Sequence, residues 1–373
     1  MRRLALVLLA LSLACVAPPL GPPTTDGSDL APPLTLQSRA SAATVGPSSL
    51  SWTRYQLGTE NLEAATVGPD GGIWVVGVGS SAYVWDGRSW TPRPISFPIA
   101  ARAALTGPDG RIWISGDFEQ KAVLGVWSDG AWARVGTGLE FPVGENSHSI
   151  RGMTIPADAP GALPFLVGNG EDISALAWVP DALGRWLPSK PLGDEPVSGI
   201  GSAWGASTSE IWGVGTSGMD NPLTVTGGRI WRYDGTAWGV ERAVPEWMVW
   251  TWGATPSDVF AVGSEGAIYR YDGVSWSREA VSSTSFFHEV HGTGPDDVWV
   301  VGSNAEVLHF DGASWTRVAL DGDGFLTAVV AAPDGTVVIA GRNGEAWVGT
   351  PEVVVEGDLV LESQAEVDAA AGV

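Results

Sequence analysis

The chain has 373 residues, with 20 basic and 42 acidic side chains, a formal net charge of −22, 50 Gly, 20 Trp and one Cys. This charge balance argues against a nucleic-acid-binding protein, because polyanions are bound through Lys and Arg. A hydrophobic content of 44% excludes disorder over most of the chain. High Gly and Trp with few charges favour many short strands joined by tight turns.

Residues 1–14 have the pattern of a secretory signal, with two arginines followed by an apolar run. The segment LSLAC at 11–15 resembles a bacterial lipoprotein signal, although Ser12 stands where Leu is favoured. This resemblance implies cleavage before Cys15, lipidation of its thiol, export and anchoring at the bacterial cell envelope. The alternative is an ordinary signal peptide with an incidental Cys. An apolar run of about 10 residues is too short to span a bilayer.

A phrase of the form Asp-Gly-x-x-Trp recurs along the chain. Its Trp residues, with two copies that deviate from the phrase included, are Trp90, Trp132, Trp186, Trp238, Trp276 and Trp315. Their spacing is close to the roughly 40–50 residues of one β-propeller blade. Upstream of the phrase, turn residues precede an alternating apolar segment that ends in Gly. Each unit therefore predicts four strands, which in the fifth unit are 249–254, 258–262, 267–271 and 275–278.

The seventh unit lacks the phrase, but residues 50–54 (LSWTR) match residues 313–317 (ASWTR) of the sixth unit. The N-terminal strand should therefore complete the last blade and close the ring, which removes exposed blade faces. The sequence predicts an all-β, seven-bladed β-propeller over 50–350. The lipidated Cys and a Pro/Ser/Thr-rich flexible tether (15–49) precede it, and an acidic tail (351–373) follows.

These Trp-rich units resemble the β-propeller repeats of exported lipoproteins of the myxobacterial type. They are more distantly similar to two-component-regulator and photosystem-assembly-factor propellers. The resemblance covers residues 50–350 and implies the fold, with most Trp side chains packed between blades. It implies no particular activity, because propellers serve in binding, scaffolding and catalysis alike.

No group of residues with the spacing of a catalytic or cofactor site is present. His288 and His291 come nearest to metal-ligand spacing, but three positions apart on a strand they point to opposite faces. His291 occupies the place of Trp204 and Trp252 in other units, which favours packing, and His309 should be solvated. The sequence has no P-loop, nucleophile elbow or Cys/His cluster. We therefore expect no metal, no cofactor and no catalytic residue.

The loops between the second and third strands of each blade should share one face with the loops between blades. Three aromatic and three acidic residues in these loops form the candidate binding sector on blades five to seven: Trp247, Phe286, Phe325, Glu265, Glu306 and Glu345. The aromatic rings either pack over the blades or stack on a ligand. The acids either form a solvated rim or bind a polar ligand.

The sequence thus predicts a non-catalytic binding or scaffold module at the bacterial cell envelope, which recognises a glycan or an envelope protein on one face. We expect it to be monomeric, to reach the membrane only through its N-terminal lipid, and not to bind nucleic acid. The alternative is a propeller hydrolase or lyase acting on extracellular polysaccharide. Such an enzyme should surround its channel with ionisable groups of shifted pKa. Glu289 is the one acid of the predicted innermost strands, which favours the binding module.

Overall fold

The computed structural model describes residues 50–352 except 120, 137–148, 160, 162, 170–175, 182, 190–196, 218–226 and 323. The predicted signal, Cys15, the tether and the acidic tail from residue 353 lie outside the described residues. Within the described part of the chain, no helix is long and apolar enough to cross a membrane.

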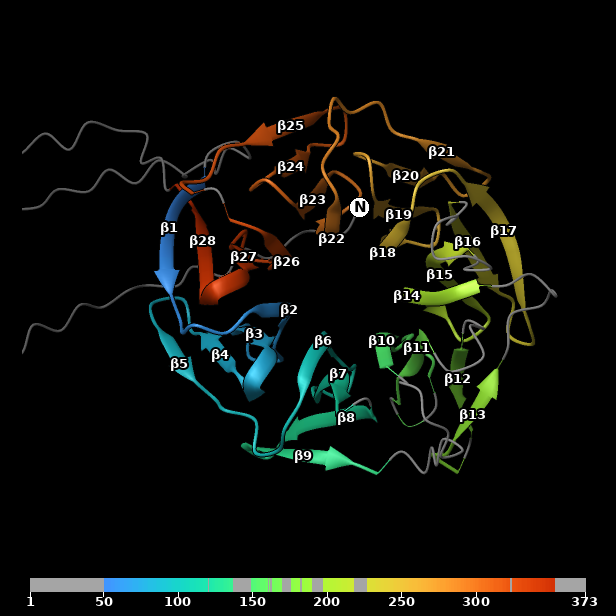
Figure 1. Ribbon diagram of the computed structural model, residues 1–373, viewed down its shortest axis with the longest axis horizontal. Coiled ribbons are helices and arrows are strands. Elements are labelled where there is room, and N and C mark those ends of the chain that lie inside the picture. Colours follow the sequence, from blue (N-terminus) through green and yellow to red (C-terminus); the bar gives the residue numbers. More distant parts are fainter. Residues whose placement is uncertain are drawn as a thin grey trace, which may run out of the picture. The chain divides into compact units, whose positions relative to one another are not determined.

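The described strands form seven antiparallel sheets of four strands, arranged as blades around a ring (Figure 1). Blade 1 consists of β2 (Leu62–Val67), β3 (Ile73–Gly77), β4 (Ala82–Trp85) and β5 (Trp90–Pro92). Blade 2 consists of β6 (Ala100–Thr106), β7 (Ile112–Phe118), β8 (Lys121–Ser128) and β9 (Ala131–Val135). Blade 3 consists of β10 (Ser149–Thr154), β11 (Phe165–Asn169), β12 (Leu176–Pro180) and β13 (Trp186–Ser189).

Blade 4 consists of β14 (Val197–Ser207), β15 (Glu210–Ser217), β16 (Gly228–Tyr233) and β17 (Trp238–Val244). Blade 5 consists of β18 (Met248–Thr255), β19 (Asp258–Gly263), β20 (Ile268–Tyr271) and β21 (Trp276–Arg278). Blade 6 consists of β22 (Phe287–Gly294), β23 (Asp297–Gly302), β24 (Val307–Phe310) and β25 (Trp315–Val318). The first strand of each blade lies next to the centre of the ring (Figure 1). The predicted fold is confirmed, and in blade 5 each strand end lies within one residue of its predicted position.

The last blade joins the two ends of the propeller. It consists of β26 (Leu326–Ala331), β27 (Val337–Gly341), β28 (Glu345–Pro351) and, as its outermost strand, β1 (Leu50–Gln56). Pairing of β1 with β28 is continuous from Leu50 opposite Pro351 to Gln56 opposite Glu345. The predicted closure of the ring by the N-terminal strand is confirmed.

The core lies between the blades. The second strand of a blade is covered on both faces, so β3 and β27 are buried at every position and read as continuous apolar runs. Aromatic rings bridge neighbouring blades. Trp74 of blade 1 lies 4.9 Å from Trp127 and 5.7 Å from Trp132 of blade 2, measured between ring centroids. Many of the Trp side chains thus pack between blades, as the sequence indicates.

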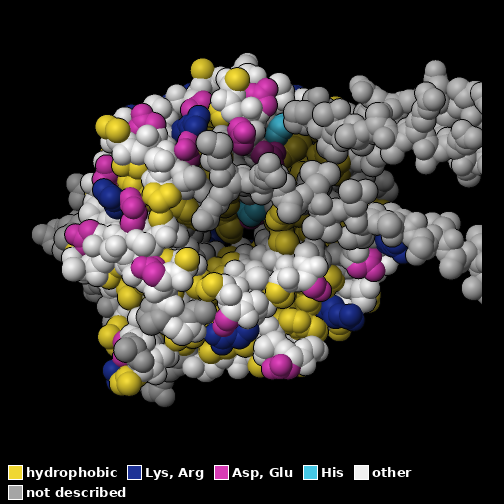
Figure 2. Space-filling view, turned by 180° about the vertical axis from the view of Figure 1, so that it is seen from behind, with side chains coloured by type: hydrophobic (Ala, Val, Ile, Leu, Met, Phe, Trp, Pro, Cys, Tyr) yellow, Lys and Arg dark blue, Asp and Glu magenta, His cyan; other side chains and the backbone are white. Residues whose placement is uncertain are grey.

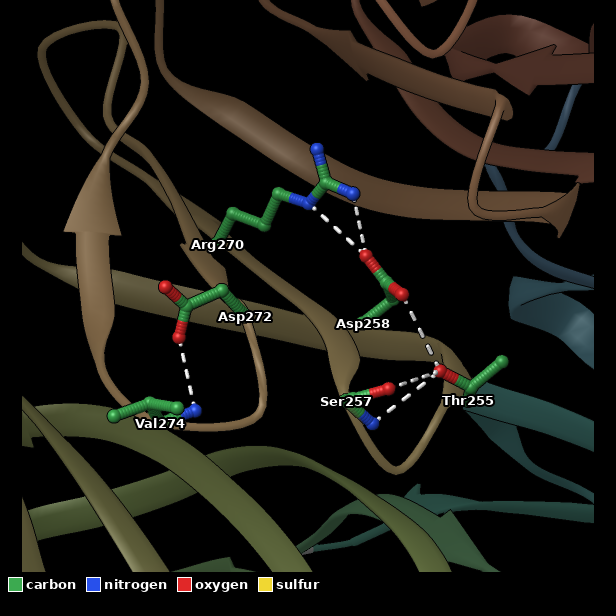
Figure 3. A network of polar contacts seen from close by, with 6 residues as sticks. All are labelled: Thr255, Ser257, Asp258, Arg270, Asp272 and Val274. Atoms are coloured by element: carbon green, nitrogen blue, oxygen red, sulfur yellow. Dashed lines mark hydrogen bonds and ion pairs between the residues drawn. The ribbon is translucent and has the colours of Figure 1, made fainter.

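The recurring Asp-Gly phrase has a structural explanation. In blade 5 the Asp272 carboxylate accepts a hydrogen bond from the Val274 N–H at 2.9 Å (Figure 3). It also accepts one from the Ser275 N–H at 2.7 Å, and the two bonds shape the turn between the third and fourth strands. Gly273 lies in the left-handed region at φ 88°, where a Cβ is disfavoured. These hydrogen bonds lower the pKa of Asp272.

Candidate functional site

In the blades whose loops are described, the loops between the second and third strands share a face with the loops between blades, since the strand pairs are antiparallel. We call it the loop face, and the opposite face, with the Asp-Gly turns, the turn face. On the loop face Trp247, Phe286 and Phe325 are structurally equivalent. Each backbone carbonyl accepts the N–H of the residue after the second strand, at 2.8, 2.9 and 3.1 Å. Trp247 is 43% exposed, while Phe286 and Phe325 are half-buried.

Phe286 and Phe325 belong to a continuous row of rings. The His288 imidazole lies between them, with ring centroids 4.9 Å from Phe286 and 4.4 Å from Phe325. The Arg342 guanidinium lies 3.8 Å from the Phe325 ring centroid, a cation–π contact. Arg342 belongs to a short 3-10 helix, η3 (Arg342–Gly344), between β27 and β28. We call Phe286, His288, Phe325 and Arg342 the aromatic row.

Two of the three predicted acids are neutralised by arginines of the outermost strands. Glu306 is buried, with an Arg317 nitrogen 2.7 Å from its carboxylate, and it also accepts the Ser283 hydroxyl at 2.8 Å. Glu345 forms an ion pair with Arg54. Their side chains are already engaged in holding loops against outer strands.

The third predicted acid, Glu265, is exposed at a left-handed φ of 56°. Sequence reasoning overlooked its neighbour Glu246, which is buried and accepts the Tyr269 hydroxyl at 2.9 Å and Arg278 Nε at 3.0 Å. The contact with Glu246 and burial together raise the pKa of Tyr269 to about 12, burial being the larger cause. A repeated Arg two residues after the outer-strand Trp was the signal for this pairing.

β-Bulges bring a second set of side chains to the loop face. All seven innermost strands carry an extra residue at the same place, beside their loop-face end. In blade 4 this residue is Gly201, which has no side chain, and in the other blades the residues are Glu63, Arg102, Arg151, Val249, His288 and Thr327. A bulge redirects a side chain and is common beside functional sites. The repeat therefore presents six variable side chains at equivalent positions near the channel.

The charges at these bulges are unevenly distributed. Arg102 pairs with Asp117 at 3.3 Å. The side chain of Arg151 keeps an exposed surface. Partial desolvation by the surrounding protein and the like charge of Arg102 lower its pKa. Burial raises the pKa of Glu63, although Arg102 and Arg342 oppose the shift. We call Glu63, Arg102, Arg151, His288 and Arg342 the channel mouth.

The imidazole of His288 is uncharged at neutral pH. Burial lowers its pKa to about 4, and the nearby positive charge of Arg342 lowers it further in the same direction. With the His288 ring neutral, the formal charges at the channel mouth are those of three arginines, of Glu63 and of Asp117, which pairs with Arg102. This acidic protein thus has a net positive charge at the channel mouth, where an anionic group would be favoured.

A central channel of about 520 Å³ runs between the innermost strands. Figure 2 shows one face of the propeller with a hollow at its centre, in which hydrophobic side chains and a histidine are visible. Glu289 and His291 line the channel. Glu289 accepts the Val329 N–H at 3.0 Å, and His291 Nδ1 accepts the Ala331 N–H at 3.2 Å.

His309 differs from expectation, because it is half-buried instead of solvated. Its ring stacks on Trp299 with centroids 4.1 Å apart, and Nε2 lies 2.9 Å from Asp297. The equivalent pair in blade 5 is Arg270 with Asp258 (Figure 3). This position therefore links the second and third strands of a blade. Among the described residues, no three His, Cys, Asp or Glu side chains lie close enough to hold a metal ion.

The fold has close parallels among solved structures. The structure titled YCF48 bound to D1 peptide has a TM-score of 0.57 at 16% identity, covering 81% of this chain and 97% of that one. Streptogramin B lyase has a TM-score of 0.62 at 12% identity, covering 80% and 97%. The WD40 propeller of Doa1 has a TM-score of 0.60 at 9% identity, covering 82% and 98%. What these chains share is the propeller fold.

At these identities the parallels establish the fold alone. No protein-family model matches the sequence, and no curated protein sequence is significantly similar to it.

Proposed function

We propose that this chain is a non-catalytic binding or scaffold module of the bacterial cell envelope, which holds an extended peptide segment with an anionic group on its loop face. The observation that carries this proposal is the aromatic row beside the channel mouth. Rigid rings provide contact area at low entropic cost. The arginines next to them provide charge-assisted hydrogen bonds to a carboxylate.

The sign of the partner's charge follows from the ion pairs. Glu306 and Glu345 are each compensated by an arginine, so they offer little attraction to a basic segment. The channel mouth, by contrast, combines Arg102, Arg151 and Arg342 with the single carboxylates of Glu63 and Asp117. An acidic side chain or a terminal carboxylate suits this arrangement better than a basic one.

Two lines of support come from outside the site. One propeller of similar fold, YCF48, has been solved with a bound peptide. The lipoprotein-type signal at Cys15 would place the loop face at the envelope on a tether. A neutral glycan is the second candidate ligand, and the exposed indole of Trp247 is the feature that favours it, since sugar rings stack on aromatic faces.

Binding of fluorescent extended peptides, followed by anisotropy, tests the proposal on the full chain without its signal. A Phe286→Ala/Phe325→Ala variant should lose about tenfold or more in affinity, as expected for central aromatic anchors. The matched control replaces exposed apolar residues of turn-face loops, Leu183→Ala/Val274→Ala, and should bind as wild type. Glu306→Gln should also keep its affinity.

Equal affinity of the Phe286/Phe325 variant and wild type would refute the placement on the aromatic row. Binding lost in the turn-face control instead would move the site to the opposite face. Binding of neutral oligosaccharides, abolished by Trp247→Ala and indifferent to the arginines, would favour the glycan over the peptide.

A further inference from the structure

The central channel is asymmetric, and the asymmetry comes from the side chains at equivalent positions. At the first position after the bulge, five blades carry small residues: Ala64, Ala103, Gly152, Ser202 and Ala328. Blades 5 and 6 carry Trp250 and Glu289 instead. Large and polar groups are thus gathered on one side of the channel.

Two residues further along the innermost strands, the same side of the channel again carries large ring side chains. Trp204, Trp252 and His291 are equivalent in blades 4, 5 and 6, since each lies opposite an aromatic residue of the second strand. The rings of Trp252 and His291 have centroids 5.4 Å apart. Blades 4 to 6 therefore present a continuous wall of three indoles, one imidazole and one carboxyl group, all lining the channel.

Most hydroxyl groups along the channel are engaged within the protein. Thr106 donates to the Val67 carbonyl at 2.6 Å, Thr154 accepts the Gly205 N–H at 2.9 Å, and Thr251 donates to the Phe260 carbonyl at 2.9 Å. These bonds link neighbouring blades or neighbouring strands, and they leave little hydroxyl capacity for a ligand.

Glu289 and His291 each use one polar atom inside the protein and leave the other available. Among the described residues, no hydrogen-bond partner occurs for Glu289 Oε1 or for His291 Nε2, and neither is a fully enclosed atom. Because His291 Nδ1 accepts a backbone N–H, the imidazole proton belongs on Nε2. Burial lowers the pKa of His291 to about 4 and raises the pKa of Glu289 well above its usual value. Both groups are therefore favoured as neutral donors.

We propose that this wall binds a small, neutral, heteroaromatic molecule with hydrogen-bond acceptors at both ends, held by Glu289 and His291 and stacked against the indoles of blades 4 to 6. The two donors lie two residues apart on β22 and therefore on the same face of the strand, so one small molecule can reach both. A chamber of about 520 Å³ falls within the range of small-molecule sites, about 300–1,000 Å³.

The charge of the ligand follows from the lining. Glu289 and His291 are the titratable side chains among the residues that line the chamber, and burial favours the uncharged form of both. A charged ligand would lose its hydration without gaining a counter-charge, which is unfavourable. This site is separate from the aromatic row, and it needs neither a metal nor a covalent step.

Isonicotinamide is a suitable probe, because it is neutral and carries a ring nitrogen and a carbonyl oxygen at opposite ends. Saturation-transfer NMR on the full chain without its signal should detect its binding in the millimolar range. Benzamide, which lacks the ring nitrogen, should bind up to about tenfold more weakly, the value of one hydrogen bond. Isonicotinate, the anionic analogue, should bind no better than benzamide.

Two variants and one wild-type measurement locate the site. His291→Phe removes the donor and should weaken isonicotinamide binding about tenfold, whereas Val274→Ala, an exposed residue that does not line the chamber, should bind as wild type. If the His291→Phe variant does not fold, NMR of the wild-type protein with isotope-labelled histidines provides the test instead. Isonicotinamide should shift the His291 imidazole resonances and leave those of His288 and His309 unchanged.

Unchanged affinity in a folded His291→Phe variant would overturn the proposal. A shift confined to His288 would place the probe at the channel mouth and would overturn it equally. Preference for isonicotinate would contradict the inferred neutrality of the wall.

Discussion

Trp52 of the first strand packs edge-on against Trp299 of blade 6, with ring centroids 6.0 Å apart and planes at 69°. The contact repeats the one between Trp212 of blade 4 and Trp276 of blade 5, at 5.2 Å and 79°. The N-terminal strand thus supplies the missing aromatic ring of the last blade as well as its hydrogen bonds. Closure of the propeller depends on both.

Removal of this strand should destabilise the whole domain. Deletion of residues 50–56 exposes the outer edge of β28 and the Trp299 ring, so we expect a lower thermal unfolding midpoint. Trp52→Ala should cost about 2 kcal/mol, less than a fully buried Trp because this side chain is half-buried. Deletion of residues 16–40 serves as the control and should leave the midpoint unchanged. A deletion of β1 without effect would contradict closure.

A second prediction concerns the packing of the innermost strand of blade 6 against that of blade 7. Trp204 lies against Gly253 of the next blade, where an added Cβ would come within 2.8 Å of the indole. Trp252 lies in the same way against Gly292, where an added Cβ would come within 3.0 Å of the indole. In blade 7 the equivalent residue is Ala331. The smaller imidazole of His291 leaves room for its Cβ.

His291→Trp should therefore destabilise the protein by about 1–3 kcal/mol through overpacking. The double variant His291→Trp/Ala331→Gly should recover part of that loss, giving a coupling energy of about 1 kcal/mol in a double-mutant cycle. Chemical unfolding of the four proteins provides the measurement. Strictly additive effects would show that the two positions do not contact each other in this way.

The Asp-Gly turns predict a dependence of stability on acid pH. In blade 4 hydrogen bonds from Thr236 (hydroxyl and N–H) and Ala237 (N–H) lower the pKa of Asp234 to about 2, against about 3.9 in an unfolded chain. A lowered folded-state pKa contributes stability above the unfolded value, and this contribution is lost as pH falls through the folded value. The relevant window is about pH 4 to 2.

Thr236→Ala removes the largest cause of the shift and should reduce the loss of stability between pH 5 and pH 2.5. Asp234→Asn removes the titration itself and should reduce that loss further. Urea unfolding at the two pH values checks both variants. An undiminished pH dependence in Asp234→Asn would show that this turn does not contribute to it.

Lipidation of Cys15 remains a prediction from the sequence. Metabolic labelling of a bacterial host that expresses the protein, with a fatty-acid analogue, should mark the wild-type protein and not Cys15→Ser. The Cys15→Ser variant should still be exported if the apolar run acts as a signal. Absence of label on both proteins would favour simple secretion.

The architecture followed from the sequence because each blade repeats the same turn and packing residues. Trp52 could be assigned to the last blade since its neighbours match those of Trp315. Trp247, Phe286 and Phe325 could be placed on one face because consecutive strands in a blade run in opposite directions. These features depend on local patterns that recur in the chain.

The charges of the channel mouth could not be foreseen in the same way. Arg102 and Arg151 reach it through bulges, and an extra residue in a strand leaves no mark in a repeat whose loops vary in length. The partners of Glu306 and Glu345 are outer-strand arginines, and Arg54 comes from the other end of the chain. Only the closed ring brings Arg54 to Glu345.

The central claim is that the loop face selects an anionic peptide. Its most direct test measures the affinity of paired acidic and basic peptides for wild type and for Arg102→Gln/Arg151→Gln, as a function of salt. The acidic peptide should bind wild type more tightly, weaken as ionic strength rises, and lose both its advantage and much of its salt dependence in the variant. Tighter binding of the basic peptide, or a salt dependence unaltered by the variant, would contradict the account.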